Sequence, residues 1–244
     1  MISNGNLTMA RKNDLSRQHV GTVINATSKK QESSLNKALQ QVKSQLVQDF
    51  NLKLRWDKQW LLSDVINRLR DEFPDVSFAD PLPRSFIKPD GGILSIVDVK
   101  EVGYPILIVE VKNQGTNDQR LAEGKPRQAM GNAIERLGKN VIGFRTAMLR
   151  ESITPFICFG YGCDFAVGSS ILDRVMTIAM FGELNKVKVV DEGQAGQFCR
   201  GSFFFREKEW DVKEMTDRML DVAKRSIYYY FAKYGEDHFC GDAE

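Results

Sequence analysis

Ser-Phe-Ile-Lys-Pro-Asp-Gly-Gly-Ile-Leu, residues 85–94, is followed by Ile-Leu-Ile-Val-Glu-Val-Lys-Asn-Gln-Gly, residues 106–115, and by Gly-Asn-Ala-Ile-Glu-Arg, residues 131–136. The apolar run from Ile106 to Val111 predicts a strand in which Glu110 and Lys112 share one face. Asp90 follows Pro89 and precedes two glycines, which predicts a turn. A hairpin between the runs 93–99 and 106–111, turning around Gly103-Tyr104-Pro105, would bring the Asp90 carboxylate beside Glu110.

Asp90, Glu110 and Lys112 are the residue types that a metal-dependent phosphodiesterase requires. Mg²⁺ binds oxygen and usually takes only one or two protein carboxylates beside water and substrate phosphate. Asp90 and Glu110 are the expected ligands, with the Val111 carbonyl as a third candidate. Lys112 would steer the attacking water or stabilise the developing charge. The alternative is that Asp90 is only a turn residue, and that Glu110 and Lys112 form the solvated face of an edge strand.

The three blocks, in this order, resemble the EcoRI-type restriction endonucleases of the PD-(D/E)xK nuclease superfamily. The regions Leu52–Asp57 and Glu209-Trp210-Asp211 are similar to the same family, so the resemblance extends from about residue 15 to about residue 235. It implies Mg²⁺-dependent cleavage of double-stranded DNA by a homodimer at a short palindromic site. It also implies a cognate DNA methyltransferase in the same restriction-modification system.

The resemblance further implies which residues contact DNA. Asn132, Ala133 and Arg136 would read the bases of a central AATT, as in a GAATTC-like site, and Glu135 would orient them. Independently, asparagine suits adenine and arginine suits purine acceptors in the major groove. The alternative for Asn132 is a helix cap. The remaining expected contacts are Gln114 near pyrimidines, Lys88 at a phosphate, and Gln128 and Ala129 near the outer base pair.

The sequence departs from the family pattern at two places. The segment between Lys112 and Gly131 is shorter than in the family, which implies a trimmed DNA-embracing arm. Gln128-Ala129 stands where the family has Met-Ala. Recognition of the central four base pairs therefore carries over to this chain more directly than recognition of the outer pair.

Composition is that of a globular protein, with 244 residues, 42% hydrophobic and 27% charged, and a net charge of +2. A DNA-binding protein of this charge must group its basic residues on one face. The four cysteines (158, 163, 199 and 240) contain no Cys-x-x-Cys pair, which disfavours a zinc site and suits a reducing cytoplasm. No apolar stretch suggests a signal peptide or a membrane span, so we expect a cytoplasmic protein without a membrane partner.

The chain is predicted to be an α/β protein, with a central mixed β-sheet flanked by helices (a restriction-endonuclease-like core) and an N-terminal arm. Residues 1–30 are the predicted arm, which is either poorly ordered or folds over a polyanion, and residues 31–244 form a single domain. The spacing of Leu35, Leu39, Val42 and Leu46 predicts a helix from Ser33. Asp57 is the predicted N-cap of a second helix that ends before Pro74. The other predicted elements are a loop or extended arm at 113–126, helices at 132–149, 170–181 and 210–230, and strands at 154–161, 187–190 and 202–206.

Two other functions fit parts of this pattern. A repair or junction-resolving nuclease would share the active site but would need no sequence-reading helix start, so Gly-Asn-Ala-Ile-Glu-Arg disfavours it. A non-catalytic DNA-binding module is disfavoured because Asp90, Glu110 and Lys112 are all present.

Overall fold

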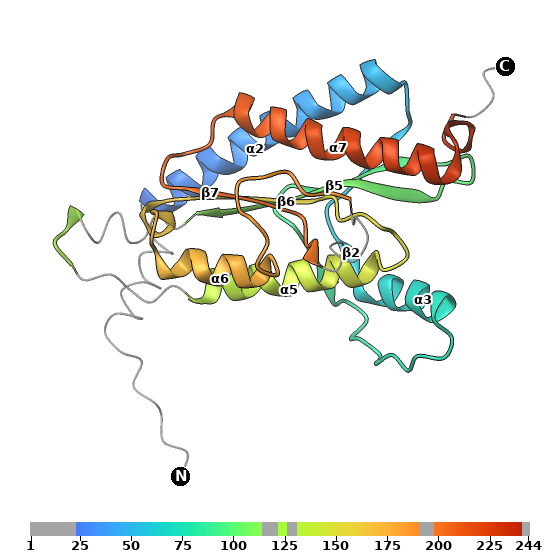
Figure 1. Ribbon diagram of the computed structural model, residues 1–244, viewed down its shortest axis with the longest axis horizontal. Coiled ribbons are helices and arrows are strands. Elements are labelled where there is room, and N and C mark those ends of the chain that lie inside the picture. The colour runs from blue at the N-terminus through green and yellow to red at the C-terminus, as the bar shows by residue number, and fades with distance from the viewer. Residues whose placement is uncertain (1–22, 114–121, 126–130, 191–197, 241–244) are drawn as a thin grey trace, which may run out of the picture.

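A five-stranded mixed sheet forms the centre of the protein in the computed structural model, which describes residues 23–113, 122–125, 131–190 and 198–240 (Figure 1). Its strand order is β1-β4-β5-β6-β7. Strands β1, β4 and β5 are antiparallel neighbours, and β5, β6 and β7 run parallel. The strands are β1 (Leu54–Asp57), β4 (Gly92–Val97), β5 (Gly103–Asn113), β6 (Phe156–Tyr161) and β7 (Ser202–Arg206). The predicted α/β class with a mixed sheet is confirmed.

Helices cover both faces of the sheet. α2 (Val23–Phe50) and α7 (Val212–Tyr234) lie side by side on one face (Figure 1). α5 (Gly131–Ala147) and α6 (Ser170–Ile178) lie on the other face, where they connect β5 to β6 and β6 to β7. Parallel neighbours need such crossovers, because a tight turn cannot join them.

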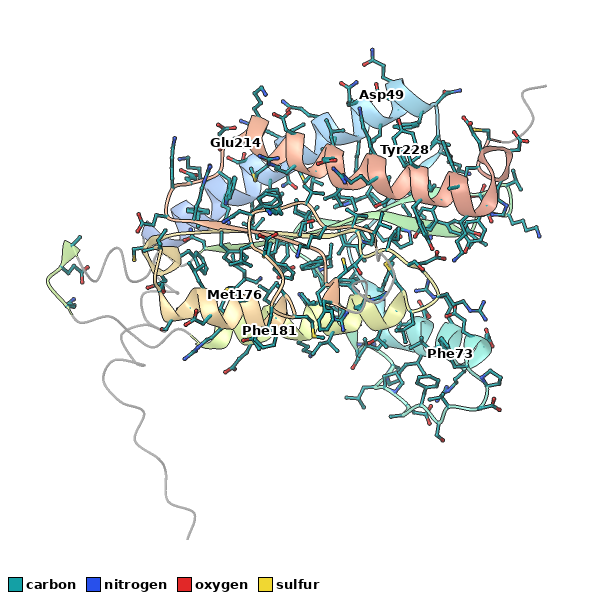
Figure 2. The ribbon with its side chains drawn as sticks, in the orientation of Figure 1. Asp49, Phe73, Met176, Phe181, Glu214 and Tyr228 are labelled. Carbon is teal, nitrogen blue, oxygen red and sulfur yellow. The ribbon has the colours of Figure 1, made fainter. Side chains whose placement is uncertain are left out.

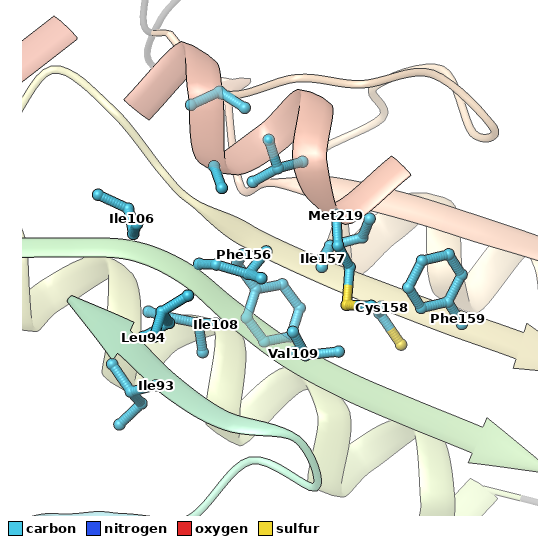
Figure 3. Packing of buried hydrophobic residues seen from close by; sticks show 14 of the residues in the cluster. Ile93, Leu94, Ile106, Ile108, Val109, Phe156, Ile157, Cys158, Phe159 and Met219 are labelled. Carbon is cyan, nitrogen blue, oxygen red and sulfur yellow. The ribbon is translucent and has the colours of Figure 1, made fainter. Parts of the chain in front are cut away.

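The core lies between these layers and is built from the predicted apolar runs. All six residues of β4 and of β6 are buried, as expected for central strands covered on both faces. Figure 3 shows the strand residues of β4, β5 and β6 packing with Met219 of α7. The predicted apolar stripe of α2 is also buried: Leu35, Leu39, Val42 and Leu46.

The predicted helix start at Asp57 is wrong. Asp57 ends β1, and the next two residues with regular structure form β2 (Trp60–Leu61), which pairs with β3 (Phe86–Ile87). Helix α3 (Leu62–Glu72) begins only after this strand, and it has no side-chain cap at its start. The sequence places Trp60 and Leu61 in the helix because their strand partners, Ile87 and Phe86, lie 27 and 25 residues further along the chain, where helical spacing gives no sign of them.

The β4–β5 hairpin is confirmed, but its predicted turn is wrong. Gly103, Tyr104 and Pro105 belong to β5, and the turn lies before them. The buried Asp98 carboxylate accepts hydrogen bonds from the backbone N–H groups of Lys100 (2.9 Å) and Val102 (2.7 Å), and so builds the turn itself.

The end of the described chain is fixed against this same turn. The short helix η3 (Glu236–His238) places Nε2 of His238 at 3.3 Å from Oδ2 of Asp98 and 3.0 Å from the Tyr104 hydroxyl. Phe239 follows in the core. The closed end of the β4–β5 hairpin is therefore held by the last described helix, whereas its open end carries Asp90 and Glu110.

Several element boundaries differ from the predictions. α2 begins at Val23, so it includes residues 23–30 of the predicted arm, whose other residues lie outside the described part of the chain. The predicted strand at 187–190 is reduced to a single bridge between Ile153 and Val190. Most of the predicted loop at 113–126 is outside the described residues. The helices at 132–149, 170–181 and 210–230 are confirmed as α5, α6 and α7, and the strands at 154–161 and 202–206 as β6 and β7.

All four cysteines are free thiols. None of the described helices combines the length and the apolar character needed to cross a lipid bilayer.

Candidate active site

Asp90 lies in the turn that leads into β4, directly beside the C-terminal half of β5. The Asp90 backbone N–H donates to Oε2 of Glu110 at 3.1 Å, and the Val111 N–H donates to Oδ2 of Asp90 at 3.2 Å. The next residue, Gly91, donates its N–H to the Val109 carbonyl at 2.9 Å. The structure thus brings the two carboxylates together at the open end of the hairpin, as the sequence predicts.

Glu110 and Lys112 point to the same side of β5 and form an ion pair. Nζ of Lys112 also lies 3.3 Å from Oδ2 of Asp90, so one ammonium group contacts both carboxylates. Val111, between them, points to the α2–α7 face near Phe159 and Met215. The predicted alternation along the strand is therefore observed.

The Glu110 side chain is 2% exposed, and burial together with neighbouring charges shifts the pKa values of Glu110 and Lys112. Burial raises the pKa of the Glu110 carboxyl, although the Lys112 ammonium opposes that effect. Burial alone would lower the pKa of Lys112, but the charges of Glu110 and Asp90 outweigh it and raise that pKa above its usual value. Lys112 is consequently held in its charged form between the two carboxyl groups.

The rim of the site opens into a polar cleft of about 640 Å³ between α2, β1 and the Asp90 turn. Polar and charged side chains from four separate parts of the chain line it: Gln31, Glu32, Asn36, Lys58, Lys88, Asp90, Lys112 and Asn113. Lys88 is exposed two residues before Asp90. Lysines grouped around the carboxylates give a surface that can take a phosphate-bearing substrate.

The donor set at this site fits Mg²⁺ better than a transition metal. In the described part of the chain, no group of three or more His, Cys, Asp or Glu side chains could hold an ion. Two carboxylates with a nearby backbone carbonyl are instead the incomplete oxygen set that Mg²⁺ accepts, because it retains several water or substrate ligands. Asp90, Glu110 and the Val111 carbonyl are the residues that could supply it.

Comparison with known proteins identifies the family. A family model described as Restriction endonuclease EcoRI matches residues 17–170. The chain belongs to the EcoRI restriction endonuclease family. It is 28% identical over 240 residues to the type II restriction enzyme RsrI of Cereibacter sphaeroides, covering 84% of this chain and 87% of that protein. It is 26% identical over 211 residues to the type II restriction enzyme EcoRI of Escherichia coli, covering 72% and 76% of the two chains.

Four of the residues expected to read DNA lie at the start of α5. Asn132 and Ala133 are in its first turn, and the exposed Glu135 and Arg136 follow within the helix. α5 begins at Gly131, so Asn132 is the second residue of the helix and does not occupy the cap position. Gln114, Gln128 and Ala129 lie outside the described residues.

Sequence reasoning missed two residues that contact this candidate site, one at Glu110 and one at the turn that carries Asp90. Asn140 of α5 donates from Nδ2 to Oε1 of Glu110 at 3.4 Å. Trp56 of β1 donates from Nε1 to the Gly91 carbonyl at 3.0 Å. The sequence carried a weak signal for each: Asn140 interrupts the apolar face between Leu137 and Val141, and Trp56 falls within the Leu52–Asp57 segment that resembles the family.

Proposed function

We propose that this chain is a type II restriction endonuclease that hydrolyses double-stranded DNA at a short palindromic site with Mg²⁺. One observation carries the proposal: in a chain of this family, Asp90, Glu110 and Lys112 contact one another, and Asp90 and Lys112 line a polar cleft. The names of the relatives RsrI and EcoRI, both type II restriction enzymes, support the same activity.

Each of the three residues has a distinct role in this proposal. Asp90 and Glu110, with the Val111 carbonyl, would hold Mg²⁺, which when bound supplies an activated water and neutralises charge on the phosphate. Lys112 keeps its proton and offers a fixed positive charge beside the attacked phosphate. Asn140 and the Asp90 N–H hold the Glu110 carboxylate in one orientation.

The cleft lysines are proposed to position the DNA backbone. Lys58 and Lys88 line the cleft next to Asp90, and exposed lysines can pair with phosphates without reading the sequence. Lys88 is the residue for which the family resemblance implies a phosphate contact.

The start of α5 is proposed to read a site with an AATT centre, in the manner of GAATTC. Asn132 and Arg136 are four residues apart in the same helix, which places them on one face. Their amide and guanidinium groups match adenine and purine acceptors in the major groove. Glu135 would brace the arginines, and Gln114, Gln128 and Ala129 would complete the contacts.

A homodimer is the proposed working form, because two-fold protein symmetry matches a palindrome and each subunit then cuts one strand. The α5–α6 layer is the surface proposed for the contact. Ile142 of α5 is 67% exposed, and Phe181, just beyond α6, is 81% exposed. Figure 2 shows Met176 and Phe181 on this side of the molecule. The proposal includes a cognate methyltransferase, which protects the host's own sites and need not bind this chain.

A substitution in this layer tests the dimer. Ile142→Asp should convert a dimer into a monomer in analytical ultracentrifugation, because it places a charge in the proposed contact. Leu82→Asp changes a residue that is 77% exposed outside this layer, and it should leave the dimer intact. A dimer that both variants preserve would place the interface elsewhere.

Incubation of the wild-type chain with plasmid DNA and Mg²⁺ tests the activity. Discrete fragments, absent when EDTA replaces Mg²⁺, are the expected result, and sequencing of their ends should give a palindrome centred on AATT. A smear would favour a repair or junction nuclease, and gel retardation without cleavage would favour a DNA-binding module. Fragments that end at another palindrome would retain the activity and reject the proposed site.

A further inference from the structure

The indole of Trp56 is hydrogen-bonded to the turn that carries Asp90. Trp56 lies in β1, opposite Leu94 of β4, and its Nε1 donates to the carbonyl of Gly91 at 3.0 Å. The Gly91 carbonyl belongs to the Gly91–Gly92 peptide, so this bond holds the backbone one residue after Asp90.

The two glycines of the turn are closely packed. Gly92 has a φ of +75°, and a Cβ on it would lie 2.4 Å from Nε1 of Trp56. A Cβ on Gly91 would lie 2.7 Å from Cβ of Val109. Because two glycines have no side chains with which to anchor themselves, the position of this turn depends on the groups that press on it, and Trp56 is the one that also donates a hydrogen bond from its side chain.

Asp90 needs this support more than Glu110 does. Glu110 is buried and is held by Lys112, Asn140 and the Asp90 N–H. The side chain of Asp90 is 48% exposed and is held by the Val111 N–H and Lys112 on the β5 side. Its position therefore depends on its own backbone, which is the segment that Trp56 holds.

Trp56 is already occupied by contacts within the protein. Nζ of Lys43, from α2, lies 4.5 Å from the centre of the Trp56 ring, which is the geometry of a cation–π contact. The indole N–H is used by Gly91. The side chain is 38% exposed at the edge of the cleft, but its N–H and one face of its ring already have partners.

We propose that Trp56 is a positioning residue for DNA cleavage, which acts by holding the Gly91 carbonyl and, through it, the Asp90 carboxylate. The proposal rests on the proposed nuclease function. It assigns the first β-strand, far from the catalytic motifs in sequence, a part in the geometry of the reaction.

The test is Trp56→Phe, which removes the indole N–H and keeps an aromatic ring. Single-turnover cleavage is measured with enzyme and Mg²⁺ in excess over a duplex carrying the site found with plasmid DNA. The rate should fall about 10-fold or more, since displacing a catalytic group by about 1 Å can cost about 100-fold. The Kd for the duplex without metal should stay within about 2-fold, because the indole N–H makes no DNA contact in this proposal.

Tyr230→Phe is the matched control. Its hydroxyl donates to the Pro105 carbonyl at 3.1 Å, so this substitution also deletes one hydrogen bond from an aromatic side chain to backbone. Pro105 lies towards the other end of β5 from Glu110. The control should lower the melting temperature at least as much as Trp56→Phe does, and its cleavage rate should equal that of the wild type.

Three results would overturn the inference. The first is a Trp56→Phe variant whose rate and DNA affinity both equal those of the wild type. The second is an unchanged rate with weakened DNA binding, which would make Trp56 a DNA contact. The third is an equal loss of rate in both variants, which would reduce Trp56 to general stability. If Trp56→Phe does not fold, benzothienylalanine at position 56, which replaces the N–H by sulfur in a ring of the same shape, gives the same readouts. A wild-type chain that cuts no DNA overturns the proposed function and this inference with it.

Discussion

At the scale of single residues, the buried ion pair of Glu110 and Lys112 decides which substitutions test catalysis cleanly. Removing one partner of a buried pair leaves an unpaired charge and typically costs about 3–5 kcal/mol. A truncation such as Glu110→Ala would therefore mix a loss of stability with a loss of chemistry. Glu110→Gln and Asp90→Asn remove the charge but keep the shape of each side chain, and Lys112→Ala is interpreted only if circular dichroism shows a folded protein.

We predict that Glu110→Gln, Asp90→Asn and Lys112→Ala each abolish DNA cleavage, because each removes a proposed metal ligand or the proposed fixed positive charge. Asp90→Asn should also bind DNA more tightly than the wild type without metal, since it takes a negative charge away from the scissile phosphate. Plasmid cleavage, gel retardation in EDTA and circular dichroism melting measure these effects. Normal turnover by a folded Lys112→Ala protein would contradict the assignment of Lys112.

Substitution of Asn132 tests the reading of the DNA sequence separately from DNA cleavage. If its amide contacts adenine, Asn132→Ala should lose about 1–3 kcal/mol of cognate binding per base contact, and a palindrome presents each contact twice. Binding to random DNA should change little, because phosphate contacts dominate it. If Asn132 serves only the first turn of α5, the variant should lose stability and keep its specificity. Melting temperature and the ratio of cognate to random affinity, measured on one variant, distinguish the two.

At the scale of elements, side-chain contacts connect the start of α7 to the end of β7. Asp211 and Glu214 form a capping box, in which the Glu214 N–H donates to Oδ1 of Asp211 at 2.7 Å. Two guanidinium nitrogens of Arg206, in β7, donate hydrogen bonds to the Glu214 carboxylate. The guanidinium carbon of Arg206 lies 3.6 Å from the centre of the Trp210 ring. The hydrogen bonds from Arg206 lower the pKa of Glu214 to about 2. Burial opposes this effect, and the hydrogen bond from the Asp211 N–H adds to it.

This low pKa predicts how the stability contributed by Glu214 depends on pH. The charged form is favoured by folding, so its contribution is complete above the ordinary value of 4.5 and is lost as the pH falls towards 2. Glu214→Gln should accordingly melt below the wild type at pH 7, and the difference should shrink progressively below pH 4.5. Thermal melts of both proteins at a series of pH values check this. A difference that stays constant down to pH 3 would assign the effect to helix capping without charge.

Some of these elements and contacts could be predicted from the sequence, and others could not. Asp90, Glu110 and Lys112 were predictable because the two strands that bring them together are joined by one short turn. Trp56 reaches its partner across 35 residues and Asn140 across 30, and no local pattern encodes such contacts. Trp60-Leu61 was mistaken for helix for the same reason. The β4–β5 turn is predicted at the wrong place because the Asp98 side chain builds it, and not the segment Gly103-Tyr104-Pro105.

At the scale of the whole molecule, a net charge of +2 must be reconciled with DNA binding. The lysines of the cleft provide the local positive charge, and each phosphate that is neutralised releases counterions. Binding should therefore weaken steeply with salt although the overall charge is small.

Lys88→Ala should reduce the slope of log K against log salt by about 1, equally for cognate and random DNA. Lys100→Ala is the matched control, because it removes the same charge from the exposed turn at the closed end of the hairpin. Fluorescence anisotropy titrations between low and physiological salt give both slopes. Equal slopes for Lys88→Ala and the wild type would exclude Lys88 from the phosphate contacts.

The contact of η3 with the β4–β5 turn also determines where a fusion partner can be attached. A tag joined beyond η3 starts beside Asp98, roughly 20 Å along the strand from Glu110 at about 3.3 Å per residue. A tag joined at the start of α2 is eight residues, or about 12 Å of helix, from Gln31, which lines the cleft, so it would lie close to the space proposed for DNA. A fluorescent reporter of DNA binding is therefore best fused at the C-terminal end. Any trimming there must stop short of Phe239, whose buried ring closes the core behind His238.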